Sequence, residues 1–138
     1  MLGFSLALSS AGILANPNGA ALFDQHCVVC HAAQGEGMPG FAPRLAGTLQ
    51  QRAASETGRA YLAQVLVDGL AGPITVDGER FNSAMPAFAQ LADTEIAALV
   101  DFLVATLNGG SSKVDAAHIA AARQKKLSPS AVRKLRGS

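Results

Sequence analysis

The sequence has no tryptophan, one tyrosine and only two cysteines among its 138 residues. With no second cysteine pair, a four-cysteine zinc site is excluded. Hydrophobic residues make up 49% of the chain, but much of this is alanine, and β-branched or aromatic runs are few. Such a composition favours helix. We expect one domain with a modest core, and a core so poor in large side chains would gain from a bulky apolar guest.

Acidic residues almost disappear towards the C-terminus. From Asn108 to Ser138 seven basic residues stand against Asp115 alone, a net charge of +6, whereas four arginines and nine acidic residues give the first 107 residues about −5. This split indicates a tail with its own role and no general affinity for nucleic acid. We expect the tail to be ordered only when it is docked, because short isolated helices are marginal in water, and we favour docking on a partner with an acidic face. The alternative is that it folds back on the acidic body.

No lysine or arginine occurs before Arg44. The first fifteen residues, MLGFSLALSSAGILA, form an apolar run that ends in small residues. The run is too short to span a bilayer, which takes about 20 apolar residues. It resembles the hydrophobic region of a secretory signal, with cleavage after Ala11 or Ala15, although the usual basic region is missing. We therefore expect a signal or apolar segment over residues 1–15 and no transmembrane span.

Three segments have helical periodicity. The first runs from about Asn18 to Cys30, with Asn16 or Asn18 as its cap, and the second from about Gly58 to Asp68. The third, from about Asp93 to Leu107, has the clearest pattern and ends at Asn-Gly-Gly. Its apolar residues recur every three or four positions: Ile96, Leu99, Val100, Leu103, Val104 and Leu107. The fold class we expect is therefore mainly α.

Turn-rich stretches separate these helices. GEGMPGFAPRLAG (35–47) is too rich in glycine and proline for helix or central strand, and AGPITVDGERFNSAMPAF (71–88) suggests a short hairpin at Asp77-Gly78. Irregular segments this long are usually functional, and the simplest explanation is that they pack on a ligand. Beyond them, Asp115 and Ser128, the latter followed by Pro129, predict the starts of two short basic helices.

The two cysteines lie in HCVVCH (26–31), with His31 directly behind Cys30. A disulfide of the thioredoxin kind needs a βαβ setting that the flanking segments do not have. A zinc site lacks a fourth ligand. The motif C-x-x-C-H is the attachment signature of c-type haem. On a helix Cys27, Cys30 and His31 share one face, so both sulfurs can form thioethers with vinyl groups while the imidazole lies beneath the iron.

From Asn18 to Leu107 the sequence resembles the class I cytochromes c, in particular small bacterial cytochromes that are partners or subunits of dehydrogenases. Gly19 and Phe23 precede CVVCH at the expected distance. The resemblance implies that the Pro43 carbonyl accepts the proton of the ligand histidine, that Met85 is the distal ligand, and that Phe102 packs against the Gly19/Phe23 pair. One departure is Ala92, where a capping serine is common, which leaves Asp93 or Thr94 to cap the last helix.

Met38, also followed by proline, is the alternative to Met85, because extended chain can bridge its distance from His31. A further alternative is that the sixth coordination position of the iron is open. We favour Met85, since it lies just before the final helix, where the resembled family has its ligand. Arg44, Arg52 and Arg59 are candidates for pairing with the haem propionates. We expect His26 to be an exposed neighbour of the haem edge, Asn82 to lie near the methionine sulfur, and no hydrolytic triad.

These features together predict a small cytochrome c-like domain over residues 16–108, wrapped around one covalent haem c, with a helical basic extension over 109–138. Cys27 and Cys30 would attach the haem, and His31 and Met85 would bind its iron. The predicted function is one-electron transfer in the bacterial periplasm, from a dehydrogenase to a respiratory acceptor. No enzymatic activity is expected. The alternative is a haem enzyme or a gas or redox sensor with an open or displaceable sixth ligand.

Overall fold

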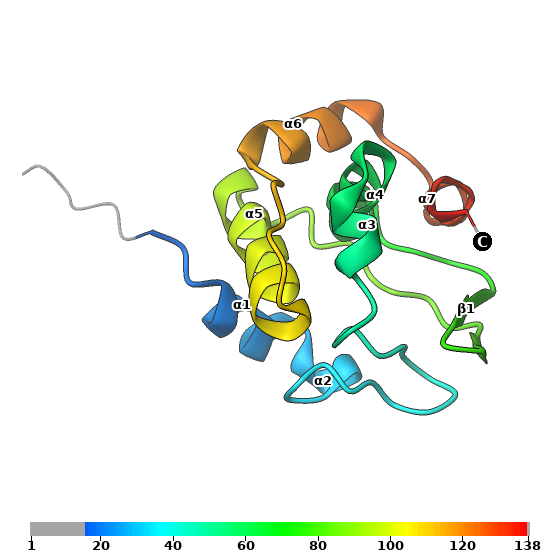
Figure 1. Ribbon diagram of the computed structural model, residues 1–138. Helices are drawn as coiled ribbons and strands as arrows, with labels where there is room; N and C mark the ends of the chain where they lie inside the picture. The colour runs from blue at the N-terminus through cyan, green and yellow to red at the C-terminus, as the bar shows by residue number, and fades with distance from the viewer. Residues whose placement is uncertain (1–15, 138) are drawn as a thin grey trace, which may run out of the picture.

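The computed structural model describes residues 16–137, so the predicted signal segment lies outside the described residues. The chain in this range is mainly helical, as expected (Figure 1). Its helices are α1 (Gly19–His26), α2 (Val28–His31), α3 (Gln50–Ala54), α4 (Glu56–Asp68), α5 (Asp93–Asp101), the π-helical turn η1 (Phe102–Thr106), α6 (Ala116–Lys125) and α7 (Pro129–Arg136), and its strands are β1 (Ile74–Val76) and β2 (Glu79–Phe81). None of these helices is long and apolar enough to cross a bilayer.

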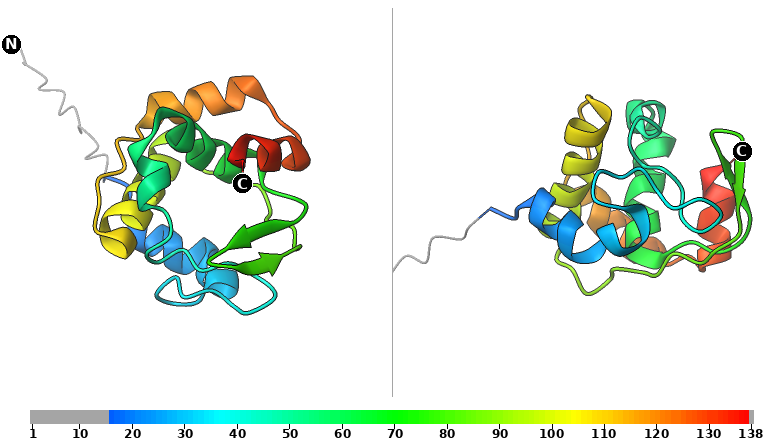
Figure 2. Two further views of the ribbon diagram at one scale, coloured as in Figure 1. Left: turned by 45° about the vertical axis from the view of Figure 1, so that its right-hand side comes forward. Right: turned by 90° about the horizontal axis from the view of Figure 1, so that it is seen from below.

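The elements form a ring. Figure 2 shows α1 and α2, α5 with η1, α3 with α4, α7 and the β-hairpin following one another around a common centre. α5 packs on α1, α6 lies against both α4 and α5, and α7 packs on α4. Side chains of α4 and α5 supply much of the buried core, including Leu62, Leu66, Ile96, Leu99 and Val100. The core therefore lies on the α4–α5 side of the ring.

The first predicted helix is interrupted. Asn18 caps α1, since its Oδ1 accepts a hydrogen bond from the Ala21 N–H at 3.2 Å. At Cys27 the backbone has φ −117° and ψ −34°, and a separate single turn, α2, follows. Ala32, with φ 63°, ends that turn. The two cysteines and His31 therefore lie on a separate short turn that begins at Cys27.

The last long helix crosses α1 at a glycine. A Cβ at Gly19 would overlap the Ala98 carbonyl and would lie 2.8 Å from the Phe102 Cβ, so only glycine permits this approach. The rings of Phe23 and Phe102 pack with centroids 5.3 Å apart at 44°. The contact that the resemblance implied for Phe102 is therefore confirmed.

The start of α5 differs from the prediction. Ala92 is the N-cap residue, and neither Asp93 nor Thr94 caps the helix. Instead, the Glu95 carboxylate reaches back and accepts a hydrogen bond from the Ala92 N–H at 2.7 Å. This is the reciprocal half of a capping box, which an acidic residue at the third helical position can form without a capping serine.

Between the long helices the structure adds one element and confirms another. α3 was not predicted, and α4 begins two residues earlier than expected, where the Ser55 Oγ accepts from the Gly58 N–H at 3.0 Å. The hairpin is confirmed, with Ile74 paired to Phe81 and Asp77 and Gly78 at positive φ in its turn. Asp-Gly is suited to that turn because both residues tolerate this conformation.

The basic tail folds back on the body. Its two predicted helices are confirmed, with Asp115 and Ser128 as their N-caps. Ile119 and Val132 have no exposed surface and belong to the same core cluster as the α4 and α5 side chains. Apolar side chains from α4 and α5, which are far from the tail in the sequence, therefore stabilise two helices that would be only marginally stable in isolation.

Polar contacts fix the tail as well. The Arg123 Nε donates to the Asp93 Oδ1 at 2.6 Å, and the Leu127 N–H donates to the Asp68 Oδ2 at 2.8 Å. The buried Gln64 Nε2 donates to the Ala122 carbonyl at 2.9 Å. The tail is therefore ordered by docking on its own body, which is the alternative of the two arrangements, because the acidic residues and the apolar cover that it needs are there.

Candidate functional site

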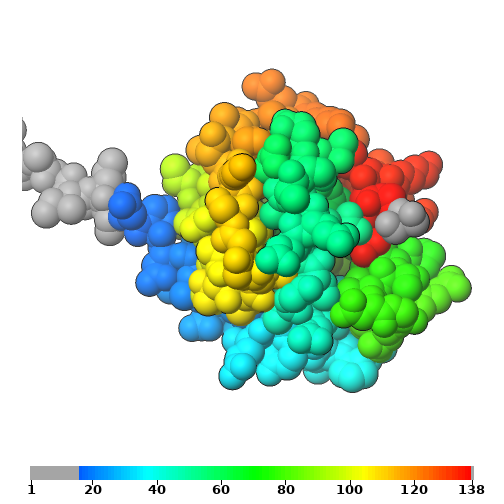
Figure 3. Space-filling view, viewed as in Figure 1, coloured from blue at the N-terminus to red at the C-terminus, as the bar shows by residue number. Residues whose placement is uncertain are grey.

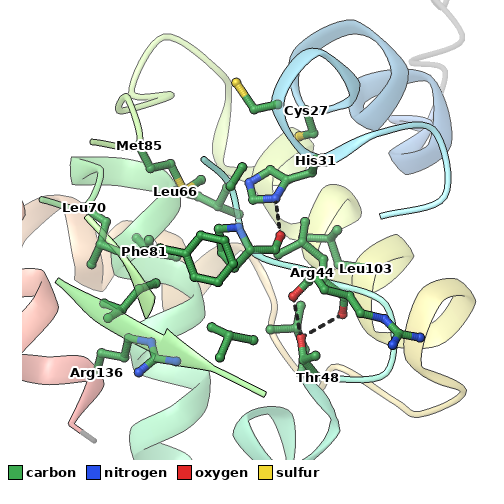
Figure 4. A pocket seen from close by; sticks show the side chains of 18 of the residues that line it. Cys27, His31, Arg44, Thr48, Leu66, Leu70, Phe81, Met85, Leu103 and Arg136 are labelled. Atoms are coloured by element: carbon green, nitrogen blue, oxygen red, sulfur yellow. Dashed lines mark hydrogen bonds between the residues drawn. The ribbon is translucent and has the colours of Figure 1, made fainter. Parts of the chain in front are cut away.

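A cavity that is partly open to solvent lies inside the ring, and Figure 4 shows side chains that line it. The empty space in it is about 1160 Å³ when the part that is open to solvent is counted. Most of its lining is apolar and comes from the 41–49 segment, α4, the hairpin, the segment before α5, and α5 with η1: Phe41, Leu45, Leu49, Leu62, Val65, Leu66, Leu70, Ile74, Val76, Phe81, Val100 and Leu103.

Cys27 and Cys30 line one wall of this cavity, and both are free thiols. Cys27 is buried, and this burial, together with the neighbouring Cys30, raises the pKa of its thiol to about 11. The cysteine nearest the core is therefore a neutral thiol. Across residues 16–137, no three histidine, cysteine or acidic side chains gather closely enough to hold a metal ion.

His31 lies beside the cysteines and points into the cavity (Figure 4). Its Nδ1 lies 2.8 Å from the Pro43 carbonyl oxygen. Since a carbonyl only accepts, Nδ1 carries the proton and Nε2 keeps its lone pair. Burial lowers the pKa of the imidazole, an effect that the Pro43 hydrogen bond opposes. A neutral imidazole whose second nitrogen is fixed in this way is the form that binds a metal ion. The hydrogen bond that the resemblance implied for Pro43 is confirmed.

Met85 projects into the same cavity from another side (Figure 4). Its backbone is held by a pair of hydrogen bonds with Leu70, of 2.8 and 3.0 Å. Gly69 makes this possible, since a Cβ there would lie 2.6 Å from the Met85 carbonyl oxygen and its φ is +79°. Met38, in contrast, is 43% exposed and is not among the lining residues. The structure thus brings Met85 and His31 together and leaves Met38 on the surface.

The arginines predicted for the site divide into two groups. Arg44 and Arg52 line the cavity. Arg59 does not, because its guanidinium donates to Glu56 at 2.8 Å and to the Ala53 carbonyl at 3.0 Å. A third lining arginine, Arg136 at the end of α7, was missed. Arg136 belongs to no sequence motif, and the only related signal in the sequence is the basic composition of the tail.

Two polar residues singled out in the sequence lie outside the cavity. His26 is half-buried, with its ring edge-on to Phe88 at a centroid distance of 5.9 Å. Asn82 is exposed and does not line the cavity. Three other polar lining residues, Thr48, Tyr61 and Ser83, were not predicted. Thr48 donates from its Oγ1 to the Arg44 carbonyl at 2.9 Å, and Tyr61 is buried on α4.

This set of residues fits haem. An apolar cavity suits the porphyrin ring, and two thiols three residues apart suit its two vinyl groups. A neutral imidazole nitrogen and a thioether are both ligands of haem iron. The lining contains arginines and no aspartate or glutamate, which suits a guest that carries two propionates.

Comparisons with known proteins agree with this fit. The family model "Cytochrome c" matches residues 17–107. The chain is 42% identical over 125 residues to a "Cytochrome c-552" of Thermus thermophilus, covering 86% of this chain and 83% of that protein. A second "Cytochrome c-552" of Thermus thermophilus is 42% identical over 121 residues, covering 83% of this chain and 91% of that protein. Both alignments are longer than the family match.

Proposed function

Because the chain belongs to the cytochrome c family, we propose that it is a periplasmic one-electron carrier with His31 and Met85 as the axial ligands of its haem. The family binds haem c covalently and transfers electrons, and its members similar to this chain are not enzymes. The haem supplies a one-electron Fe(III)/Fe(II) couple. The observation that carries the proposal is that a histidine with its Nδ1 already engaged and a methionine line one apolar cavity.

Cys27 and Cys30 are proposed to attach the haem through thioether bonds. They are the only two cysteines of the chain, and both line the cavity beside His31. In each bond the sulfur would add to one vinyl carbon and the thiol hydrogen would go to the other. Attachment at these two cysteines would hold one edge of the haem next to the His31 imidazole.

The environment of these ligands favours electron transfer over reaction at the iron. A methionine thioether is a soft ligand that favours ferrous iron, and an apolar cavity disfavours the additional charge of ferric iron, so both raise the reduction potential. If His31 and Met85 both bound the iron, no coordination position would be left for a substrate. This arrangement is the argument against a gas sensor or a haem enzyme with an open sixth position.

The periplasmic location is supported by the signal-like residues 1–15, and a dehydrogenase donor and a respiratory acceptor by the resemblance to cytochromes that serve dehydrogenases. Optical spectroscopy of the oxidised protein tests the site. We expect a weak far-red charge-transfer band, which reports methionine sulfur bound to ferric iron. A high-spin ferric band instead would establish the open-site alternative.

A further inference from the structure

Two arginines from distant parts of the chain meet at one edge of the cavity. Arg52 belongs to α3 and Arg136 is the last residue of α7, and both line the cavity. The Arg52 Nη1 donates to the Arg136 carbonyl at 3.0 Å, so the end of α7 is tied to α3. In the space-filling view α7 lies against the α3 region and the hairpin (Figure 3). The Arg52 guanidinium also lies 5.0 Å from the centroid of the Tyr61 ring.

These two cations lack a counter-charge among residues 16–137. Neither takes part in an ion pair there. Arg136 donates from Nη2 to the Thr75 carbonyl at 3.1 Å and its side chain also hydrogen-bonds to the Tyr61 phenol, which leaves further donors of its five N–H groups for an anion. Burial and the nearby Arg136 both lower the pKa of Arg52. Bringing like charges together at a half-buried position costs free energy that an anion between them would offset.

The cavity changes character at this edge. A second, more polar pocket adjoins it, and the two share Thr48, Arg52, Tyr61, Val76 and Arg136. The lining of this second pocket includes hydroxyl and amide side chains and one carboxylate, Asp77, which is exposed in the hairpin turn. A guest with an apolar body and an anionic end would therefore lie with its anionic end here.

We propose that Arg52 and Arg136 bind a propionate of the haem, which makes the C-terminal extension part of the cofactor site. This inference rests on the proposed function. It assigns haem binding to Arg136, a residue outside the family match at 17–107. The docked tail would then have a chemical role at the cavity. The Arg136 charge stabilises the ionised propionate and, through its proximity to the haem, the less positive ferrous state.

The test uses three variants of the full-length holoprotein. Arg136→Gln removes the positive charge, and Arg136→Lys keeps the charge but lacks the planar guanidinium group. Lys134→Gln removes an exposed positive charge from the same helix and is the control. The reduction potential is measured across the pH range in which carboxylates titrate. We expect Arg136→Gln to lower the potential at pH values where the propionates are ionised. The pH-dependent fall in potential should move to higher pH, because the propionate loses its cation. Arg136→Lys should restore part of both effects, and Lys134→Gln should produce much smaller ones.

Equal shifts in Arg136→Gln and Lys134→Gln would overturn the inference, since the effect would then be one of net charge. A lower melting temperature in Arg136→Gln with an unchanged potential and pH profile would also overturn it, because Arg136 would be only structural. The other titratable groups that line the cavity are Cys27, Cys30, His31, Arg44 and Tyr61, and the adjoining polar pocket adds the Asp77 carboxylate. None of the three variants alters these groups. The far-red band of the wild-type protein is a separate measurement, so failure of the methionine ligation is distinguishable from failure of this inference.

Discussion

The rings of Phe23 and Phe102 pack 5.3 Å apart where α1 crosses the end of α5. Phe23 is fully buried. Both residues belong to elements that border the cavity: α1 leads directly into the turn with Cys27, Cys30 and His31, and Leu103, next to Phe102, lines the cavity. This aromatic contact therefore sets the position of the cysteine wall relative to the last helix.

The same crossing predicts the effect of Gly19→Ala. The added methyl group would overlap the Ala98 carbonyl, so the helices must separate. We expect the variant to lose about 1–3 kcal/mol of unfolding free energy, as overpacked sites do, measured by denaturant titration. Gly110→Ala is the matched control, because a Cβ there would have no neighbour nearer than the Val104 Cγ1 at an ordinary 3.4 Å. Similar losses in the two variants would show that the crossing does not depend on glycine.

Met85→Ala should open the sixth coordination position and lower the reduction potential, because loss of the thioether removes a preference for ferrous iron. Met38→Ala should change neither property, since Met38 is exposed and outside the cavity lining. Absorption spectra of the oxidised proteins and redox titration measure both effects. If the Met85→Ala spectrum matched that of the wild type, the axial ligand would have to be assigned elsewhere.

Local sequence predicted the parts of the site that a short motif or a regular spacing encodes. CVVCH placed two thiols and a histidine together, and the hairpin followed from Asp77-Gly78 between two short strands. α3 was missed because five residues are too few to show helical periodicity. The break at Cys27 was missed because VVCH continues the pattern of α1, and no glycine or proline marks the change in direction.

Contacts between distant segments were beyond such reasoning. The tail was predicted as two helices with little apolar surface. Whether its few apolar side chains are buried depends on the surface against which they pack, and the sequence does not give that surface. Ile119 and Val132 are each completely buried, which the sequence of the tail does not indicate. Arg136 likewise reaches the cavity only because α7 packs on α4.

Burial of the tail predicts that Ile119→Ala destabilises the whole domain. Removing this fully buried side chain leaves a cavity between α6 and the body, and such changes cost about 2–5 kcal/mol. Thermal or denaturant unfolding followed at the haem absorption should show this loss. Lys125→Ala, an exposed change on the same helix, should stay within about 0.5 kcal/mol of the wild type. An unchanged stability in Ile119→Ala would mean that the tail does not stabilise the haem domain in solution.

The buried position of Tyr61 allows a prediction of how the free energy of unfolding changes in alkaline solution. Burial raises the pKa of its phenol, although the Arg136 and Arg52 cations oppose this effect. An unfolded tyrosine loses its proton near pH ~10, whereas the folded one keeps it to higher pH. Between these two pKa values the unfolded state binds fewer protons, so the free energy of unfolding must fall as pH rises. Below about pH 10 the same group makes no pH-dependent contribution.

The measurement is direct because Tyr61 is the only tyrosine in the chain. Difference absorbance between the wild type and Tyr61→Phe isolates the phenolate signal from the haem and from every other group. We expect its midpoint above about 10 and a steeper alkaline loss of stability in the wild type than in Tyr61→Phe. A midpoint below the ordinary value would mean that the two guanidinium groups outweigh burial. Tyr61 would then ionise more readily in the folded protein than in the unfolded one, and the wild type would gain stability relative to Tyr61→Phe as pH rises.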